Sequence, residues 1–508
     1  MTVGLIQQLH RHGVDRPHQL AVAAISTTTS DGDSAPPALT WRQTANCVDA
    51  LARRIDAATS PDANVLIMLP NAPALYITML AVLASGRAAM PLAPQSTAAE
   101  AATAAGRASI QLAITSPLFA GEAPPFTCPV WSPTDVFAGD ASPAASPPLD
   151  RSERAMLLLH STGTTGRPHI VCRTGPSLDI MAANLAQAMS LQADDHVLAM
   201  PPMFHSYGME HSLITPLYVG TRVSLMPGFD VAATQAAIDE GTITTLPGLP
   251  TVFEALAQRA QRTPGFDALR HVYSAGAPLP LSVRNACRQR LGLRIGQVYG
   301  MTELGSLTYN DAAAADFDDA SVGRPLRDVV FRFAMPDDDE GTAAPTSTPA
   351  SSTTREGHLL VQAPTMLTSY LDDPMPTLIA GAFPTGDLAS IDKNQRLYIT
   401  GRLKLLIDIG GLKVNPLEVE AVLRNHPAVR DCVVLPIRIT DTANRLAAVV
   451  VRHEDDHDVT TDALRQFVRA SLAPHKTPRR IIFRDDLPTA ATGKVLRNQL
   501  LNELGDSA

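Results

Sequence analysis

Residues 161–169, Ser-Thr-Gly-Thr-Thr-Gly-Arg-Pro-His, are the stretch around which we expect this chain to be organised. Gly163 and Gly166 let the backbone turn tightly, so that its N–H groups can approach a ligand closely. Four hydroxyl donors lie at the same place: Ser161, Thr162, Thr164 and Thr165. The apolar run 156–159 just before the loop predicts a buried strand. A buried strand leading into such a loop predicts a cradle for a phosphate group.

A run rich in serine, threonine and glycine is also typical of an ordinary loop, which stays the alternative at this point. The run is not the P-loop of kinases and GTPases, because that motif ends in Gly-Lys-Ser/Thr. Here Gly166 is followed by Arg167, and the later pair Gly493-Lys494 is followed by Val495. Any phosphates must therefore be held in a different way.

Length, charge and cysteine usage narrow the class of protein. A chain of 508 residues predicts two to four domains. A hydrophobic fraction of 45% with 18% charged residues is typical of a globular protein, and a net charge of −9 argues against nucleic acid as a partner. Five cysteines without a Cys-x-x-Cys pair argue against a zinc ribbon or a disulfide framework and suit a reducing cytosol, so we expect a cytoplasmic protein. We expect no signal peptide, and the longest apolar stretch, 75–84, is too short to span a bilayer.

Strands and helices alternate in the first part of the chain. Residues 38–58 have helical spacing of apolar residues, and 65–71 predicts a buried strand that ends in a turn. A helix over about 73–85 and a short strand at 88–92 follow. This alternation predicts an α/β fold with a largely parallel sheet. In such folds ligands bind at the carboxyl ends of strands, where the 161–169 loop would lie.

Several later segments give the loop a context. They are 202–208 (Pro-Met-Phe-His-Ser-Tyr-Gly), 274–279 (Ser-Ala-Gly-Ala-Pro-Leu), 299–303 (Tyr-Gly-Met-Thr-Glu), 385–387 (Thr-Gly-Asp), 401–404 (Gly-Arg-Leu-Lys) and 487–495, which contains Lys494. Together with the loop they resemble the motifs of the adenylate-forming superfamily, which includes acyl- and aryl-CoA synthetases, peptide-synthetase adenylation domains and firefly luciferase. The closest resemblance is to the AMP-dependent acyl and aryl acid ligases, and it extends over essentially the whole chain. The loop matches the family pattern through Pro168 and departs from it at His169 and Ile170, where the family has Lys and Gly.

The resemblance implies a large N-terminal α/β domain, 1–402, that binds ATP and the acid. A small, mobile α+β domain, 403–508, would carry the catalytic lysine, with the hinge at Lys404. Within the small domain, segment 410–420 predicts a loop followed by a helix, with Asn415 as the cap and Pro416 in the first turn. Residues 429–437 and 447–451 predict strands, and 462–472 predicts a helix.

The resemblance also implies which residues bind the nucleotide. They are Ser161, Thr162, Gly163, Thr164, Thr165, Gly166, Gly276, Ala277, Tyr299, Gly300, Met301, Thr302, Asp387 and Arg402. Tyr299 would stack on adenine, and Thr302 would bond the α-phosphate. Asp387 would chelate the ribose hydroxyls with help from Arg402, the chemistry by which dinucleotide folds bind ribose. Glu303 would offer Mg²⁺ a hard carboxylate oxygen.

The acid would lie beside segment 202–208. The resemblance implies a pocket lined by His205, Tyr207, Met209, Ala275 and Gly300, with Met203, Ala277 and Met301 adding apolar surface. Such a pocket suits an aryl or medium-chain acyl group. Peptide-synthetase domains that use α-amino acids usually carry Phe-Asp where this chain has Phe204-His205, which points away from an amino acid.

The predicted activity is ATP-dependent activation of a carboxylic acid to acyl-AMP with release of pyrophosphate, followed by transfer to the thiol of CoA or of a pantetheinyl carrier protein. The catalytic candidates are Lys494, Glu303, Thr302 and His205. Lys494 would stabilise the negative charge that gathers on the pentavalent phosphorus. Two alternatives stay open: an amino-acid adenylation enzyme and a non-catalytic nucleotide- or acyl-binding homologue. The acid, the thiol acceptor, the effect of His169 and association into a homodimer are also left open.

One segment has a misleading pattern. Residues 453–457, His-Glu-Asp-Asp-His, fit the zinc-protease pattern His-Glu-x-x-His. That pattern binds zinc only when both histidines lie on one face of a packed helix. Here it follows a predicted strand and lies in an acidic run without an apolar face, so we predict a solvated loop.

Overall fold

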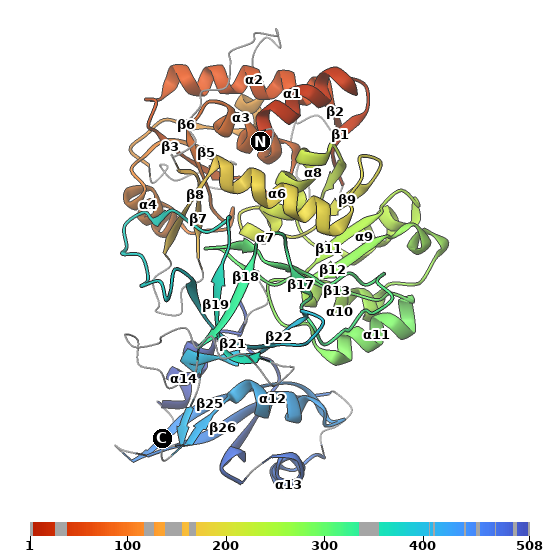
Figure 1. The fold of residues 1–508 in the computed structure, drawn as a ribbon, viewed down its shortest axis with the longest axis vertical. Coiled ribbons are helices and arrows are strands. Elements are labelled where there is room, and N and C mark those ends of the chain that lie inside the picture. Colours follow the sequence, from red (N-terminus) through yellow and green to blue (C-terminus); the bar gives the residue numbers. More distant parts are fainter. Residues whose placement is uncertain are drawn as a thin grey trace. The chain divides into compact units, whose positions relative to one another are not determined.

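The computed structural model describes most of the chain (Figure 1). The residues that it describes are 4–25, 38–115, 126–137, 155–161, 169–334, 355–405, 407–409, 412–440, 443–453, 458–472, 474–490 and 495–505. The chain divides into two compact units, Met1–Val330 with Gln362–Pro376, and Phe331–Val361 with Thr377–Ala508. The domain boundary at 402/403 stays a prediction.

One seven-stranded sheet of the first unit is parallel except at one edge. Its order is β13 (Gly296–Gln297), β12 (His271–Ser274), β11 (Thr245–Gly248), β9 (His196–Ala199), β10 (Arg222–Leu225), β1 (Leu20–Ala24) and β2 (Ala38–Thr40). Only the pair β1 and β2 is antiparallel. Helices α9 (Val231–Asp239), α10 (Pro250–Arg259) and α11 (Leu281–Leu291) contribute to its core, which includes Phe253 and Leu256. The predicted alternation of strands and helices is confirmed.

The second seven-stranded sheet carries the loop. Its order is β20 (Ser369–Tyr370), β8 (Ile170–Thr174), β7 (Ala155–His160), β4 (Ala88–Pro91), β3 (Asn64–Met68), β5 (Ile110–Thr115) and β6 (Val130–Trp131). Strands β7, β4, β3, β5 and β6 are parallel; β8 pairs antiparallel with β7, and β20 pairs antiparallel with β8. The 161–169 loop therefore leaves the carboxyl end of β7, as expected, but returns directly as an antiparallel strand. Such a short connection has no room for the helical crossover that a parallel neighbour requires.

Helices α1 (Leu5–Asp15), α2 (Trp41–Ala58) and α3 (Pro73–Ala84) pack together in the first unit (Figure 1). Helix α3 is buried on all sides from Pro73 to Leu83, which explains its uniformly apolar sequence. Region 38–58 is split between β2 and α2, because Thr40 and Gln43 form a capping box that starts the helix. The other helices of this unit are α4 (Ala98–Arg107), α5 (Pro133–Val136), α6 (Gly175–Met189), α7 (Ser206–Met209) and α8 (Thr215–Val219).

Two short hairpins complete the first unit. Strands β14 (Gly300–Met301) and β15 (Gly305–Ser306) form one, and β16 (Thr308–Tyr309) pairs with β17 (Arg324–Pro325) in the other. Between α7 and α8 the chain forms a π-helix over Glu210–Ile214. Such turns are frequent at functional sites. No described helix is long and apolar enough to cross a membrane.

The second unit contains a four-stranded sheet and a small α/β layer. The four-stranded sheet has the order β18 (Val330–Ala334), β19 (Arg355–Gln362), β21 (Phe383–Ile391) and β22 (Leu397–Arg402). Lys404 lies in the following 3₁₀ turn, Leu403–Leu405. The later elements are the hairpin β23 (Ile407–Ile409) and β24 (Leu412–Val414), the sheet β25 (Val429–Thr440), β26 (Ala443–Arg452) and β27 (Arg480–Arg484), and helices α12 (Pro416–Arg424), α13 (Thr461–Ser471) and α14 (Arg497–Gly505).

Alternate residues of β25 explain how helices cover both faces of its sheet. Cys432 and Val434 pack with apolar residues of α12 and α13. Val433 and Leu435 point to the opposite face and pack with α14. The predicted strands and the helix of this region are confirmed, and Asn415 caps α12 by accepting a hydrogen bond from the backbone N–H of Leu417 at 3.1 Å.

Candidate active site

The hairpin β7–β8 presents unpaired polar groups beside the predicted phosphate loop. The backbone N–H of Ser161 donates to the C=O of His169 at 2.9 Å, which closes the base of the loop. Residues 162–168 lie outside the described part of the chain. Among the described residues, the Ser161 hydroxyl and the Nε2 atom of His160 are buried without a hydrogen-bond partner. Buried polar groups are normally paired, so these two atoms fit a polar ligand such as a phosphate.

His169, which stands where the family has Lys, is held by an acidic side chain. Its Nδ1 atom lies 2.8 Å from Oδ2 of Asp373. Its ring lies 4.8 Å, centroid to centroid, from that of Tyr370. Arg107 binds the neighbouring Asp372 with two hydrogen bonds, of 2.6 and 2.8 Å. The pairing of β20 with β8 brings Tyr370, Asp372 and Asp373, some 200 positions later in sequence, to His169 at the end of the loop.

The turn 299–303 is shaped by the hairpin that contains it. A Cβ atom at Gly300 would lie 2.5 Å from the C=O oxygen of Gly305, so the close approach of β14 and β15 requires glycine. Glu303 is buried, and its Oε1 atom accepts a hydrogen bond of 3.2 Å from the Tyr370 hydroxyl. Burial raises the pKa of Tyr370, so this hydroxyl keeps its proton and can donate. Tyr370 therefore contacts both His169 and Glu303.

Glu303, held by Tyr370, fits the magnesium ion that the family resemblance implies. Within the described residues, no cluster of three or more His, Cys, Asp or Glu side chains could hold a metal. Magnesium in nucleotide enzymes is usually held by one or two carboxylates together with phosphate oxygens. Glu303 supplies such a carboxylate, held in place by Tyr370.

Of the zinc-like segment 453–457, only His453 is described; it directly follows β26, and residues 454–457 lie outside the described part of the chain.

A buried ion pair lies beneath the same turn. The guanidinium of Arg173 and the carboxylate of Glu210 approach to 3.6 Å, and both side chains are almost completely enclosed. Glu210 also accepts hydrogen bonds from the backbone N–H (2.9 Å) and the hydroxyl (2.8 Å) of Ser306. Arg173 donates to the C=O of Thr302 at 3.5 Å. The pair therefore holds the hairpin that carries Thr302 and Glu303.

His205 is in ring contact with its chain neighbour Phe204. Its ring is 4.5 Å from that of Phe204, and burial, with His160 as a second cause, lowers the pKa of His205 to about 4. The side chain is therefore neutral near pH 7. Gly208 fixes this segment, because a Cβ atom there would lie 2.1 Å from the C=O oxygen of Pro202.

The other residues of the predicted acid pocket lie on neighbouring elements of the first unit. The Tyr207 hydroxyl donates to the C=O of Gly248 at 3.2 Å. Met203, Met209 and Ala275 are buried, whereas Gly276 is exposed and Ala277 and Met301 are half-buried. Gly276 has φ +84°, a conformation that favours glycine at this turn after β12.

Asp387 and Arg402 form a cross-strand pair in the second unit. They are register partners in β21 and β22, and Nε of Arg402 donates to Oδ1 of Asp387 at 2.6 Å. The Asp387 side chain is 5% exposed. A carboxylate fixed in this way is suited to accept hydrogen bonds from a diol. Their role in ribose binding stays a prediction.

Sequence reasoning missed Tyr370, Asp373 and the pair Arg173–Glu210. Arg173 had a visible signal, a charged residue inside the apolar strand that follows the loop. Tyr370 and Asp373 had none, because they reach the loop only through the pairing of β20 with β8. Lys494 and the side chain of Lys404 lie outside what is described, so their roles stay predictions.

Comparison with known proteins identifies the family. Residues 14–371 match the model of the AMP-binding enzyme family, and residues 418–494 match the model of the AMP-binding enzyme C-terminal domain. The chain belongs to this family of adenylate-forming enzymes. It is 27% identical over 466 residues to 4-coumarate–CoA ligase 2 of Solanum tuberosum, which covers 86% of this chain and 83% of the relative.

Solved structures share the fold. ATP-bound MatB from Rhodopseudomonas palustris superposes with a TM-score of 0.87 at 23% identity, over 99% of both chains. The o-succinylbenzoate CoA synthetase MenE from Bacillus subtilis, in complex with ATP and a magnesium ion, superposes with a TM-score of 0.83 at 22% identity, over 97% of this chain and 99% of that one. The predicted fold class is therefore confirmed.

The buried histidines make the stability of the protein sensitive to acid. Burial lowers the pKa of His196 and His205 to about 4 and that of His211 to about 3, below the value of about 6.5 in an unfolded chain. The unfolded state therefore binds protons first, and stability falls as the pH decreases from about 6.5 to about 4. Asp179 opposes this trend, because burial raises its pKa to about 6. We expect urea unfolding to show a falling free energy of unfolding over this range, with a smaller fall in His205→Gln; a free energy that stays level would contradict this.

The Arg173–Glu210 pair can be tested by a double-mutant cycle. Arg173→Met leaves a buried carboxylate without its cation, which typically costs about 3–5 kcal/mol. Replacing Glu210 with Gln in the same chain should recover much of that loss, measured as the free energy of unfolding in urea. Additive effects of the two substitutions would show that the pair does not couple.

Proposed function

We propose that this protein activates a carboxylic acid with ATP to give acyl-AMP and pyrophosphate, and then transfers the acyl group to a thiol. The observation that carries the proposal is that one residue, Tyr370, contacts both His169, at the end of the predicted phosphate loop, and the Glu303 carboxylate. It brings the candidate magnesium ligand together with a loop whose base contains the buried, unpaired Ser161 hydroxyl. The family match and the ATP-bound structures of similar fold support the same conclusion.

In the first step, a carboxylate oxygen of the acid attacks the α-phosphorus of ATP, and the bond from that phosphorus to the pyrophosphate oxygen breaks. Thr302 would bond the α-phosphate, and Lys494 would stabilise the extra negative charge on its oxygens. His205 is neutral near pH 7 and would donate a hydrogen bond to the carboxylate of the acid. Glu303 would hold a magnesium ion, which would neutralise charge on the phosphates.

In the second step, a thiol sulfur attacks the acyl carbon of acyl-AMP. A carbon–sulfur bond forms, the bond from the acyl carbon to the phosphate oxygen breaks, AMP leaves and the thiol proton is released to solvent. The similar protein from Solanum tuberosum is a CoA ligase, so CoA is the first acceptor to test. A pantetheinyl carrier protein, which presents the same thiol chemistry, is the second.

We propose an aryl or medium-chain acyl acid as the substrate class. Among the predicted pocket residues, Met203, Met209 and Ala275 are apolar and Tyr207 is aromatic, and none of the predicted pocket residues is charged near pH 7. An α-amino acid would leave its ammonium group without a carboxylate partner among them, which disfavours the amino-acid alternative.

Pyrophosphate release with ATP and Mg²⁺ tests this proposal directly. The panel is 4-coumarate, benzoate, octanoate, malonate and phenylalanine, each with and without CoA. We expect release with an aryl or medium-chain acid, formation of a thioester or of free acyl-AMP, and loss of release in Lys494→Ala, which removes the charge-stabilising ammonium. Near-normal release in Lys494→Ala would contradict the role of that lysine. Silence of the wild-type protein with every acid, while ATP still binds, would favour the non-catalytic alternative.

The effect of His169 is a separate prediction. Because its ring is engaged by Asp373 and Tyr370, we expect the loop backbone and hydroxyls to bind the phosphates without it. His169→Ala should therefore lower kcat/KM for ATP by less than about tenfold, the effect of losing about 1.4 kcal/mol. Steady-state kinetics with varied ATP provide the measurement, with Glu303→Gln as the control that should lose far more activity. A loss in His169→Ala as large as in the control would contradict it.

A further inference from the structure

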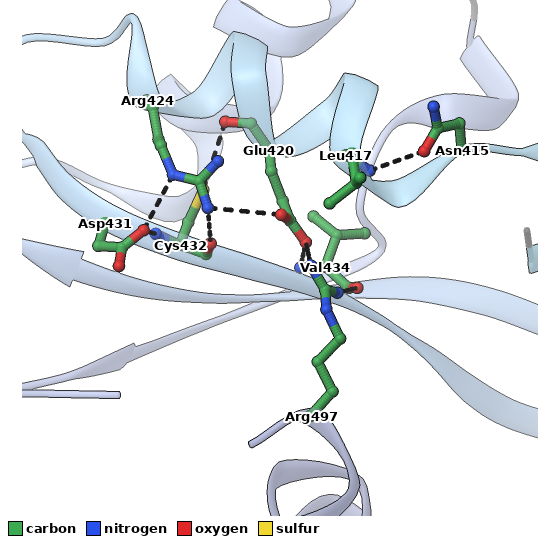
Figure 2. Close-up of polar contacts among 8 residues, drawn as sticks. All are labelled: Asn415, Leu417, Glu420, Arg424, Asp431, Cys432, Val434 and Arg497. Atoms are coloured by element: carbon green, nitrogen blue, oxygen red, sulfur yellow. Dashed lines mark hydrogen bonds and ion pairs between the residues drawn. The ribbon is translucent and has the colours of Figure 1, made fainter. Parts of the chain in front are cut away.

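A buried carboxylate in the second unit connects two of its helices (Figure 2). Glu420 lies on α12 and is 0% exposed. Its Oε1 atom accepts hydrogen bonds from Nη2 of Arg497 at 2.6 Å and from the backbone N–H of Val434 at 2.8 Å. Nη2 of Arg424 lies 3.4 Å from its Oε2 atom. The carboxylate is thus enclosed by donors from three elements, α12, α14 and β25.

This cluster covers the outer edge of β25, as Figure 2 shows. The C=O of Val434 accepts a hydrogen bond from Arg497 at 2.9 Å, and its N–H is bound by Glu420. Two residues earlier, Arg424 binds the C=O of Cys432 at 2.8 Å. Alternate residues of an antiparallel strand direct both backbone groups to the same side, so these are the groups that face away from β26. Charged side chains therefore satisfy an edge that would otherwise be open to pairing.

Arg497 is also close in sequence to the predicted catalytic lysine. It is the first residue of α14 and follows Lys494 by three positions. Between them, Val495 forms an isolated antiparallel bridge with Thr489. Val495, the residue directly after Lys494, is therefore held by strand pairing, and Arg497, two residues later, binds the sheet at Val434.

Glu420 lies at the end of segment 410–420, which the sequence predicted as a loop followed by a helix. It lies in the second turn of α12, the helix that follows segment 410–411 and is capped by Asn415. Val419 and Leu423, its neighbours on α12, are fully buried in the core. The carboxylate therefore belongs to a helix that cannot shift without disturbing that core, and it provides a fixed attachment for Arg497.

We propose that Glu420 and Arg497 are positioning residues for the first half-reaction. They fix the start of α14 against β25, and this is the attachment that directly follows the segment containing Lys494. A buried carboxylate needs a cationic partner, so this pairing favours one register of α14 over all others. The inference rests on the proposed function, because it assigns Lys494 to charge stabilisation during acyl-AMP formation.

Two matched variants separate positioning from plain stability. Arg497→Gln and Arg424→Gln each remove one cationic partner of the same buried carboxylate. Arg424 is otherwise bound to Asp431 at 2.9 Å and to Cys432, and is remote in sequence from Lys494. We expect Arg497→Gln to lower ATP–pyrophosphate exchange at least tenfold, about the effect of a small misplacement of a reacting group, relative to Arg424→Gln.

The second half-reaction is the internal reference. It is measured as CoA thioester formation from the synthetic acyl-adenylate of the acid that the wild-type protein activates fastest in the panel above. We expect Arg497→Gln and Arg424→Gln to differ little in this reaction, and Arg497→Lys, which keeps the charge, to regain part of the exchange activity. Equal losses in both half-reactions for Arg497→Gln and Arg424→Gln would mean that the pair is only structural and would overturn the inference.

Hydrogen exchange gives a readout that does not depend on the acid. In the full chain, backbone amides of residues 495–500 should exchange faster in Arg497→Gln than in Arg424→Gln, because the start of α14 has lost its attachment. Equal exchange in the two variants would overturn the positioning role even if activity fell. A wild-type protein that is silent with every acid would count against the proposed function instead, and the exchange result would still decide whether Arg497 fixes α14.

Discussion

The pairing of β20 with β8 is the constraint on which the candidate site of the first unit depends. The loop after β7 returns as an antiparallel strand, so the edge of that strand is open to a further partner. Residues 369–370 fill this edge, and Tyr370 then reaches both His169 and Glu303. One backbone pairing thus fixes the position of the candidate magnesium ligand relative to the exit of the phosphate loop.

Buried charges serve the same purpose in each unit. Glu210 holds the hairpin of Thr302 and Glu303 through Ser306, and Glu420 holds the start of α14 through Arg497. Such pairs contribute little net stability, because desolvation offsets most of the attraction, but losing one partner is costly. They therefore act against alternative arrangements of the short, polar segments that they anchor. Apolar packing alone would hold such segments less specifically, since it has no directional preference.

Much of the fold could be predicted from sequence because local patterns determine it. The apolar runs at β3, β4 and β7, the uniformly apolar α3 and the Asn415–Pro416 start of α12 all indicate their own structure. The resemblance of 299–303 to a family motif also made Glu303 a candidate ligand. The partners of that site could not be predicted, because Tyr370 and Asp373 lie in an unremarkable segment and reach the loop only through strand pairing. The antiparallel direction of β8 was missed for a related reason, since an apolar run carries no sign of its direction.

The substitution of His for Lys at 169 is best understood through what surrounds it. A lysine at this position would bring a flexible ammonium to the phosphates, whereas His169 is already bound to Asp373 and its ring contacts that of Tyr370. Asp372, beside Asp373, is bound in turn by Arg107, so the position is part of a polar network. A side chain held in this way is suited to shape the exit of the loop.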